Sequence, residues 1–277
     1  GASAGVLKSL IDKGIFEEFY QETDRINFTG EISNHEINLN KVQQQAFDEI
    51  QQNFQEDKVC LLHGVTSSGK TEIYIKLIEE VVNKGGQALY LLPEIALTTQ
   101  LIKRLQNYFG DKVLVYHSKY SLNERVEIYK HVLDNSEKGK IVIGARSCIF
   151  LPFQELGLIV VDEEHESTFK QFDPAPRYHA RDSAVVLASL FKANIVLGSA
   201  TPSIESYFNA DHNKYALVEL SRRYGNVLMP EVEIVDIKTV HRKKKMTGHF
   251  SERLLEEIKE SLKEEEQVIL FQNRRGF

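Results

Sequence analysis

The sequence predicts an α/β protein with a doubly wound, mostly parallel sheet flanked by helices. Short, continuous apolar runs recur along the chain, as expected of strands that are buried on both faces. Amphipathic stretches with apolar residues four apart separate these runs. Such alternation is typical of parallel strands joined by right-handed helical crossovers.

The predicted elements follow this pattern from one end of the chain to the other. Strands are predicted over residues 59–62, 88–92, 113–116, 141–143, 158–161 and 195–197, and the run 267–271 begins another. Helices are predicted over 71–84, 181–193 and 251–266. A short helix, too short to fold alone, is predicted before Gly14, and the polar stretch 21–40 indicates a linker.

Composition limits the classes of protein that the chain can belong to. With 277 residues, 42% of them hydrophobic, the chain can bury a normal core. The sequence predicts neither a membrane span nor a secretory signal, so a cytoplasmic location is the default. The formal charge of −6 argues against a broad basic surface, and any nucleic-acid contact would be local. Cys60 and Cys148 lie in apolar runs, which predicts buried thiols.

A phosphate-binding loop is predicted between the first strand and the helix after it. The pattern G-x-x-x-x-G-K-[ST] occurs there in the strand–loop–helix context that it requires, which disfavours an ordinary glycine turn. Backbone N–H groups would surround phosphate oxygens, Lys70 would neutralise the β- and γ-phosphates, and Thr71 would offer a hydroxyl to magnesium. The predicted nucleotide-binding residues of the loop are Gly64, Thr66, Ser67, Ser68, Gly69, Lys70 and Thr71.

Two carboxylates follow a predicted buried strand, at the sheet edge where open α/β sheets bind ligands. Asp162 is predicted to hold magnesium together with Thr71, and Glu163 to orient and deprotonate the attacking water. A solvated acidic loop is the alternative, and the strand before it makes that the weaker reading. His165 joins Lys70, Asp162 and Glu163 as a predicted catalytic residue.

Another predicted strand ends in small and hydroxyl residues that could hydrogen-bond the acidic segment. This contact would link the nucleotide state to something outside the pocket. The predicted coupling residues are Gly198, Ser199, Ala200 and Thr201.

A segment after the carboxylates interleaves aromatic and cationic side chains. Aromatic rings stack on bases and cations meet phosphates, so the segment predicts a single-stranded nucleic-acid contact. Packing of some rings under a long loop is the alternative, above all for Phe172, and Pro174 and Pro176 disfavour a helix. The predicted contact residues are Phe169, Lys170, Phe172, Arg177, Tyr178 and Arg181. The cationic run 241–245 could also touch DNA, although such runs are usually solvated.

The phosphate loop, the segment 162–165 and the segment 198–202, in this order and each at a strand end, resemble a superfamily 2 helicase. Further segments are similar to the PriA family of primosomal replication-restart helicases. These segments are 91–98, 143–147, 169–182 and 273–277, and residues 2–16 resemble the end of that family's winged-helix domain.

The resemblance implies a RecA-like P-loop NTPase lobe of an ATP-dependent 3′-to-5′ DNA helicase that restarts replication. It implies an adenine contact at Gln43 and nucleic-acid contacts at Thr98 and Arg146, with ATP and Mg²⁺ as cofactors. Zinc is expected in the full-length family but not in this part of it. DNA forks, single-stranded DNA, single-stranded DNA-binding protein and primosome-loading proteins are the implied partners.

The same resemblance implies a division of the chain. Residues 1–24 would end a winged-helix domain, 25–40 would form a linker, 41–225 would form the ATP-binding lobe, and 226–277 would begin a second, truncated lobe. We therefore expect a fragment that binds ATP but hydrolyses it poorly, because an arginine finger from a second lobe is missing. Ser67 departs from the family, which has glycine there. The alternatives are another superfamily 2 translocase and a P-loop phosphotransferase that acts on a small molecule.

Overall fold

The computed structural model describes residues 4–17, 37–56, 58–96, 99–117, 120–223 and 231–271. The chain divides into two units, Gly1–Val227 and Leu228–Phe277. In the first unit, parallel strands form one seven-stranded sheet in the order β3-β4-β2-β5-β8-β1-β9. The strands are β1 Val59–Gly64, β2 Gln87–Leu91, β3 Val113–Tyr116, β4 Ile141–Gly144, β5 Leu156–Asp162, β8 Asn194–Ser199 and β9 Tyr215–Leu220.

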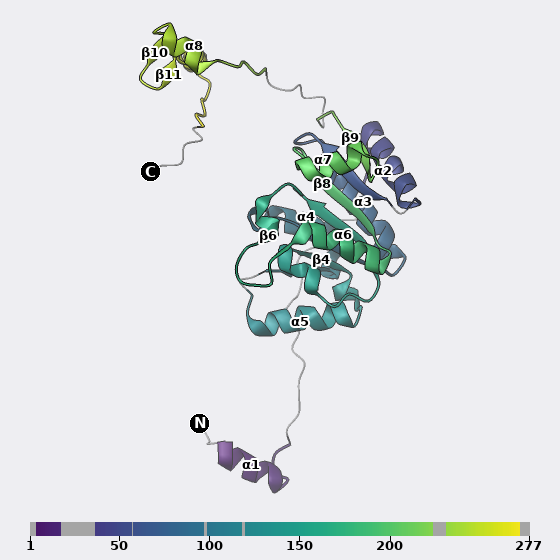
Figure 1. Ribbon diagram of the computed structural model, residues 1–277. Coiled ribbons are helices and arrows are strands. Elements are labelled where there is room, and N and C mark those ends of the chain that lie inside the picture. The colour runs from purple at the N-terminus through teal and green to yellow at the C-terminus, as the bar shows by residue number, and fades with distance from the viewer. Residues whose placement is uncertain are drawn as a thin grey trace. The chain divides into compact units, whose positions relative to one another are not determined.

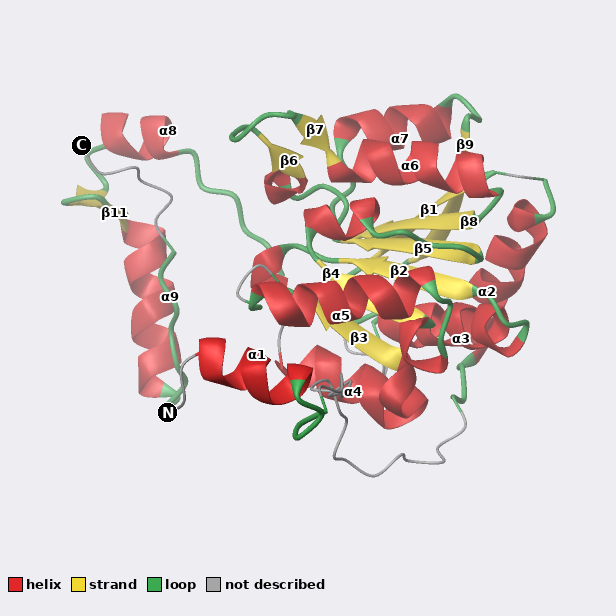
Figure 2. Ribbon diagram, turned by 90° about the horizontal axis from the view of Figure 1, so that it is seen from below, coloured by secondary structure: helices red, strands yellow, loops and turns green. Residues whose placement is uncertain are grey.

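Helices cover both faces of this sheet (Figures 1 and 2). On one face lie α2 Lys41–Phe54, α3 Lys70–Asn83 and α4 Thr99–Phe109. On the other lie α5 Leu122–Leu133, α6 Ala180–Phe191 and α7 Ile204–Asp211. The predicted α/β class with a parallel, doubly wound sheet is thus confirmed.

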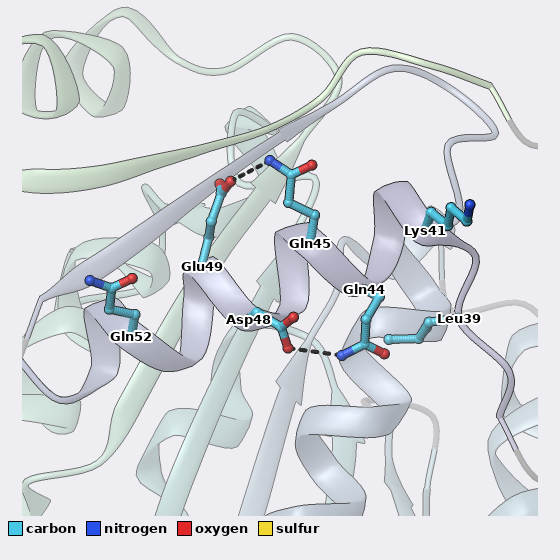
Figure 3. Close-up of a pocket in the computed structure, with 7 residues that line it drawn as sticks. All are labelled: Leu39, Lys41, Gln44, Gln45, Asp48, Glu49 and Gln52. Carbon is cyan, nitrogen blue, oxygen red and sulfur yellow. Dashed lines mark hydrogen bonds between the residues drawn. The ribbon is translucent and has the colours of Figure 1, made fainter.

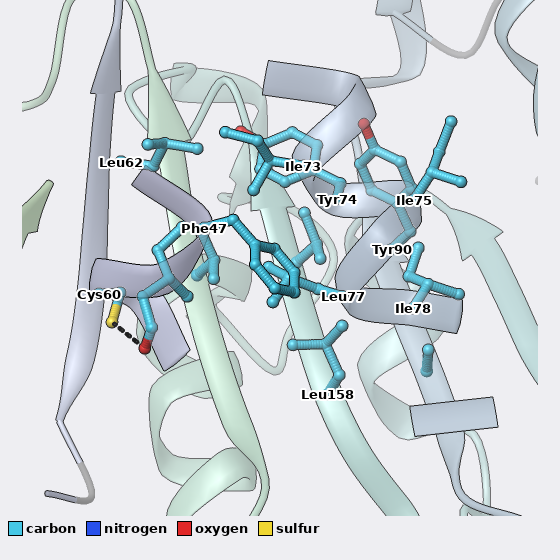
Figure 4. Packing of buried hydrophobic residues seen from close by; sticks show 14 of the residues in the cluster. Phe47, Cys60, Leu62, Ile73, Tyr74, Ile75, Leu77, Ile78, Tyr90 and Leu158 are labelled. Carbon is cyan, nitrogen blue, oxygen red and sulfur yellow. Dashed lines mark hydrogen bonds between the residues drawn. The ribbon is translucent and has the colours of Figure 1, made fainter. Parts of the chain in front are cut away.

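Strand periodicity assigns alternate side chains to two hydrophobic cores. In β1, Cys60 and Leu62 belong to the core beneath α2 and α3, whereas Leu61 belongs to the core on the opposite face, with residues of α6 and α7. Figure 4 shows the first of these cores, where Phe47 of α2 and Ile73 of α3 meet the strands. Because the inner strands of this sheet are covered on both sides, they read in the sequence as continuous apolar runs.

The predicted strands and helices of the first unit are confirmed, with ends that differ by a few residues. The helix near the N-terminus is α1, Ala4–Asp12, and part of the predicted linker lies outside the described residues. Strand β9 was not predicted. It lies at the sheet edge beside β1, its burial alternates only partly, and one charged residue, Glu219, interrupts its apolar run. A hairpin of two short antiparallel strands, β6 Lys170–Gln171 and β7 Tyr178–His179, precedes α6. The proline-containing segment between these strands is not helical, as predicted.

The second unit contains α8 Ile237–Arg242, a hairpin of β10 Met246–Thr247 with β11 Phe250–Ser251, and α9 Glu252–Lys263. The predicted helix over 251–266 is confirmed as α9. The predicted strand over 267–271 is wrong, because these residues have no regular secondary structure. A strand needs a neighbour to hydrogen-bond, and within the described part of this unit none pairs with that run.

Candidate nucleotide-binding and hydrolysis site

The predicted phosphate loop joins the end of β1 to the start of α3. Gly69 is the N-cap of α3 with a φ of +86°, and a Cβ there would lie 2.0 Å from Gln43 Nε2. Ser67 also has a positive φ, +62°, so serine takes the left-handed conformation that glycine would adopt at less cost. Lys70 Nζ donates to the carbonyl of Gly64 at 2.9 Å. The loop therefore wraps the N-terminus of α3, where backbone N–H groups favour an anion.

Gln43 fastens the predicted adenine-side segment to this loop. It forms a capping box with Asn40: Gln43 N donates to Asn40 Oδ1 at 2.9 Å, and Asn40 N donates to Gln43 Oε1 at 3.0 Å. Its side-chain amide is buried and donates to the carbonyls of Gly69, at 3.3 Å, and Ser68, at 3.5 Å. Its position beside the loop rests on these contacts, while its contact with adenine stays a prediction.

Asp162 ends β5 between two buried tyrosines that sequence reasoning missed. Tyr74 of α3 donates its hydroxyl to Asp162 Oδ1 at 3.2 Å, and Tyr90 of β2 donates to Oδ2 at 3.1 Å. Burial, then the neighbouring charge of Glu163, raise the pKa of Asp162, against which Lys70 and the two hydroxyls favour the carboxylate. Each tyrosine looks in the sequence like another core residue, and only the fold brings the two hydroxyls together.

Gly198 of β8 leaves the space that this arrangement needs. A Cβ at that position would lie 1.7 Å from the Tyr74 hydroxyl oxygen and 3.4 Å from Asp162 Oδ1. The predicted coupling segment therefore lies directly against Asp162 and Tyr74, and it fits there because Gly198 has no side chain.

Two of the remaining predicted coupling residues, Ser199 and Thr201, contact His165 beside Glu163, while Ala200 lines the pocket. His165 Nδ1 lies 2.8 Å from Ser199 Oγ and 3.7 Å from Glu163 Oε2, and His165 Nε2 lies 3.5 Å from Thr201 Oγ1. Thr201 N donates to Ser199 Oγ at 3.0 Å. Glu163 itself has a φ of +51°, a conformation that costs energy and recurs at functional positions. The structure thus brings the acidic and hydroxyl segments together.

Glu164, between the two predicted catalytic residues Glu163 and His165, is fully buried. Its carboxylate accepts from Arg181 Nη1 at 3.0 Å, from the backbone N and the hydroxyl of Ser203 at 2.7 and 3.1 Å, and from the Ser206 hydroxyl at 2.8 Å. A buried charge with a cation and three further donors is well compensated. This hub ties the acidic segment to the N-terminal ends of α6 and α7.

The hub changes the interpretation of two residues of the aromatic and basic segment. Arg181 is buried and bonded to Glu164, Asp182 and Ser203, so its guanidinium does not face an external phosphate in this structure. Phe169 is 1% exposed and packs in the core, as the alternative reading had it for some rings. Neither placement favours the predicted nucleic-acid contact.

Other residues of that segment do face solvent. Phe172 is 63% exposed, Lys170 Nζ lies 5.1 Å from its ring centroid, and Arg177 Nε donates to its carbonyl at 2.9 Å. Tyr178 meets exposed Phe150 edge to face with centroids 4.9 Å apart. An exposed ring with cationic side chains nearby is a surface on which a base can stack.

The other two predicted nucleic-acid residues are placed differently. Arg146 follows the end of β4, is half-buried, and donates to the carbonyl of Thr168 at 3.1 Å, which joins it to the start of the aromatic segment. Thr98 lies outside the described residues.

Phosphate loop and carboxylates line one pocket of about 350 Å³. Its lining residues are Thr66, Ser67, Ser68, Gly69, Lys70, Thr71, Glu72, Arg104, Asp162, Glu163 and Ala200. Ser68 has a buried hydroxyl for which the described residues offer no hydrogen-bond partner. A helix N-terminus, a lysine, a threonine and carboxylates that line one pocket, and a buried serine hydroxyl without a described partner, fit a magnesium–triphosphate group. Glu72 and Arg104 were not predicted, because neither belongs to the loop or to the acidic motif.

A larger hollow on the outer side of α2 has a different character (Figure 3). It is lined largely by polar residues, and Gln44 and Gln45 donate to the carboxylates of Asp48 and Glu49 at 2.8 and 3.0 Å. Two carboxylates against Lys41 make it unfavourable for a phosphate. The smaller pocket at the sheet edge is therefore the nucleotide-site candidate.

The described part of the chain has no helix long and apolar enough to cross a bilayer.

Comparison with known proteins agrees with the geometry of the pocket. Replication restart protein PriA of Bacillus subtilis is 41% identical over 99% of this chain and 34% of its own length. The PriA proteins of Rickettsia felis and Haemophilus influenzae are 47% and 39% identical over 80% and 99% of this chain, and over 33% and 38% of their own lengths.

These matches confirm the predicted resemblance, and the chain spans about a third of the length of the relatives. The sequence pattern of the DEAD/DEAH box helicases matches residues 40–209, which include the phosphate loop, Asp162–Glu163 and the coupling segment. On this match over more than half of its length, the chain belongs to the DEAD/DEAH box helicase family.

Proposed function

We propose that the chain is the ATP-binding lobe of an ATP-dependent 3′-to-5′ DNA helicase that restarts replication at stalled or repaired forks. The observation that carries the proposal is the convergence of Lys70, Asp162 and Glu163 on one pocket at the carboxyl edge of the sheet. The similarity to PriA proteins supports replication restart as the setting. Residues 41–225 would form this lobe. Residues 1–24 would end a winged-helix domain, 25–40 would be a linker, and 226–277 would begin a second lobe. The whole protein would be cytoplasmic.

The proposed chemistry assigns one role to each side chain. Lys70 exchanges its bond to the Gly64 carbonyl for the β- and γ-phosphates, and the N-terminus of α3 supplies backbone N–H donors. Thr71 and Asp162 would hold a magnesium ion, which neutralises phosphate charge. Glu163 orients the attacking water and accepts its proton. His165, with Ser199 and Thr201, holds the Glu163 side of the pocket in register with β8.

Nucleic acid would reach this pocket through the exposed part of the aromatic segment. Phe172 and Tyr178 offer rings for stacking, and Lys170 and Arg177 offer charge for the backbone. We infer that their signal arrives through the adjoining hub, since Arg181 at the end of the segment is bonded to Glu164 next to Glu163. Single-stranded DNA and forks are the proposed ligands. By resemblance, single-stranded DNA-binding protein and primosome-loading proteins are the proposed partners.

ATP hydrolysis with and without forked DNA tests this function. We propose that this chain is part of a longer protein, and DNA should raise the ATP hydrolysis rate of that longer protein. Glu163→Gln should bind a fluorescent ATP analogue yet hydrolyse ATP at least about 100-fold more slowly, because it lacks the general base. The Phe172→Ala/Tyr178→Ala variant should lose only the stimulation. If DNA changes no rate, the helicase assignment falls and small phosphate acceptors are to be tested.

The chain by itself provides a second arm of this test. It should bind ATP and hydrolyse it poorly, because an arginine finger from a second lobe contributes about 10³–10⁵ in rate in this class of enzyme. DNA-stimulated turnover of the chain equal to that of the longer protein would contradict the proposed division of labour between lobes.

A further inference from the structure

An arginine outside the sequence motifs lines the nucleotide pocket. Arg104 lies in the middle of α4, and its guanidinium Nη2 is bonded to Glu72 Oε1 of α3. Both side chains remain partly accessible, at 40% for Arg104 and 27% for Glu72. An ion pair this open contributes little to stability, so stability alone does not explain its place in the pocket.

The charge balance of the pocket gives Arg104 a reason to be there. Among the described lining residues Lys70 and Arg104 are the cations, and Glu72, Asp162 and Glu163 are the carboxylates, which gives a formal charge of −1. A nucleoside triphosphate brings further negative charge even when magnesium is bound. Without Arg104 the same residues would carry −2, and the pocket would repel its ligand more strongly.

Glu72 sits where it can compete with a phosphate for that guanidinium. It is the third residue of α3, and its Oε2 lies 3.2 Å from the point where a Cβ of Gly69 would be. The carboxylate therefore lies beside the helix N-terminus that is proposed to bind phosphates. A guanidinium has five N–H donors, and the structure records Glu72 as its only hydrogen-bond partner among the described residues.

The charge of Arg104 also acts on the Asp162 part of the pocket. Burial and the charge of Asp162 raise the pKa of Tyr90, and the positive charge of Arg104 acts on the same hydroxyl in the opposite direction. The Tyr90 hydroxyl is bonded to Asp162 Oδ2. Arg104 thus lines the same pocket as Asp162 and lies within electrostatic reach of the Tyr90–Asp162 pair.

We propose that Arg104 is a terminal-phosphate ligand: Glu72 holds its guanidinium in the nucleotide-free chain, and the γ-phosphate of a bound triphosphate takes it over. The inference rests on the proposed nucleotide site and adds to it a residue that distinguishes triphosphate from diphosphate. Glu72 is then a competitor for Arg104 rather than a support for it.

Equilibrium titration with fluorescent ATP and ADP analogues, with magnesium, tests this on the 277-residue chain. Arg104→Gln should weaken ATP binding about tenfold or more, since a charge-assisted hydrogen bond is lost, and ADP binding less than threefold. Glu72→Gln should leave ATP binding unchanged or tighter. Glu72→Gln/Arg104→Gln should behave as Arg104→Gln alone.

The matched control is Lys103→Gln, which removes the same charge from an exposed neighbour on α4 that does not line the pocket. It should change neither affinity. Equal weakening of ATP and ADP by Arg104→Gln, or weakening by Glu72→Gln of the same size, would make the pair a structural bond and overturn the inference. Thermal unfolding of each variant checks that the fold is retained.

Failure of the nucleotide site itself has a separate signature. If the unaltered chain binds neither analogue, or if Lys70→Ala binds both as well as the unaltered chain, the proposed site is wrong and the inference falls with it. If Lys70→Ala loses binding and Arg104→Gln keeps the preference for ATP over ADP, the site stands and only the role of Arg104 is refuted.

Discussion

Removal of the Glu164 carboxylate should unfold the first unit more readily than almost any other single change. The Glu164→Ala variant leaves Arg181 with only the exposed carboxylate of Asp182 as an ionic partner and leaves three donors on Ser203 and Ser206 without this acceptor. Breaking a buried ion pair from one side costs about 3–5 kcal/mol. We expect a loss of that size, which is a large part of the stability of a domain.

Urea unfolding followed by circular dichroism measures this loss. Ser206→Ala is the graded comparison, because it removes one neutral donor and should cost about 1 kcal/mol. The double variant Glu164→Leu/Arg181→Met replaces both charges with apolar groups of similar size and should be more stable than Glu164→Ala. A loss below about 1 kcal/mol for Glu164→Ala would refute the hub as a compensated buried charge.

Three further predictions concern single side chains of the site. Asp162 has a raised pKa in the folded chain, so its ionisation lowers the free energy of unfolding as pH rises through that pKa. Asp162→Asn should therefore stabilise the nucleotide-free chain at pH 7. Urea titrations should show that this stabilisation shrinks as pH falls toward 4. Phe169→Ala should cost about 3–5 kcal/mol because the ring is buried, whereas Phe172→Ala should change the free energy of unfolding by less than about 0.5 kcal/mol, and equal losses in urea would contradict these placements. Gly198→Ala should displace Tyr74, which would appear as weaker binding of a fluorescent ATP analogue and a lower melting temperature; unchanged values would show that the backbone yields freely.

Much of this fold can be predicted from sequence because the parallel strands are buried on both faces. The strand over 113–116 is found with the predicted ends, and 59–62 extends by two residues into the phosphate loop. Edge elements are harder. Glu219 interrupts the apolar run of β9, and the apolar run 267–271 has strand composition but no pairing partner among the described residues.

The candidate site divides along the same line. Residues that occur in contiguous motifs, such as Lys70 and Asp162, were predictable because motif spacing reflects strand and loop geometry. Tyr74 and Arg104 were not, since they lie on α3 and α4 outside the motif positions and carry no pattern of their own. Arg181 was assigned to nucleic acid by its basic neighbourhood, whereas burial, a tertiary property, places it in the hub.

The position of β8 between β1 and β5 sets the distance between the two halves of the site. Neighbouring strands lie about 4.8 Å apart, so the ends of β1 and β5 are held about 10 Å from each other by backbone hydrogen bonds alone. The intervening strand can leave that span open only if it ends in small residues, as Gly198, Ser199 and Ala200 do. Side-chain substitutions elsewhere in the pocket can change which ligand binds, but the distance between the phosphate loop and Asp162 is set by the spacing of the strands.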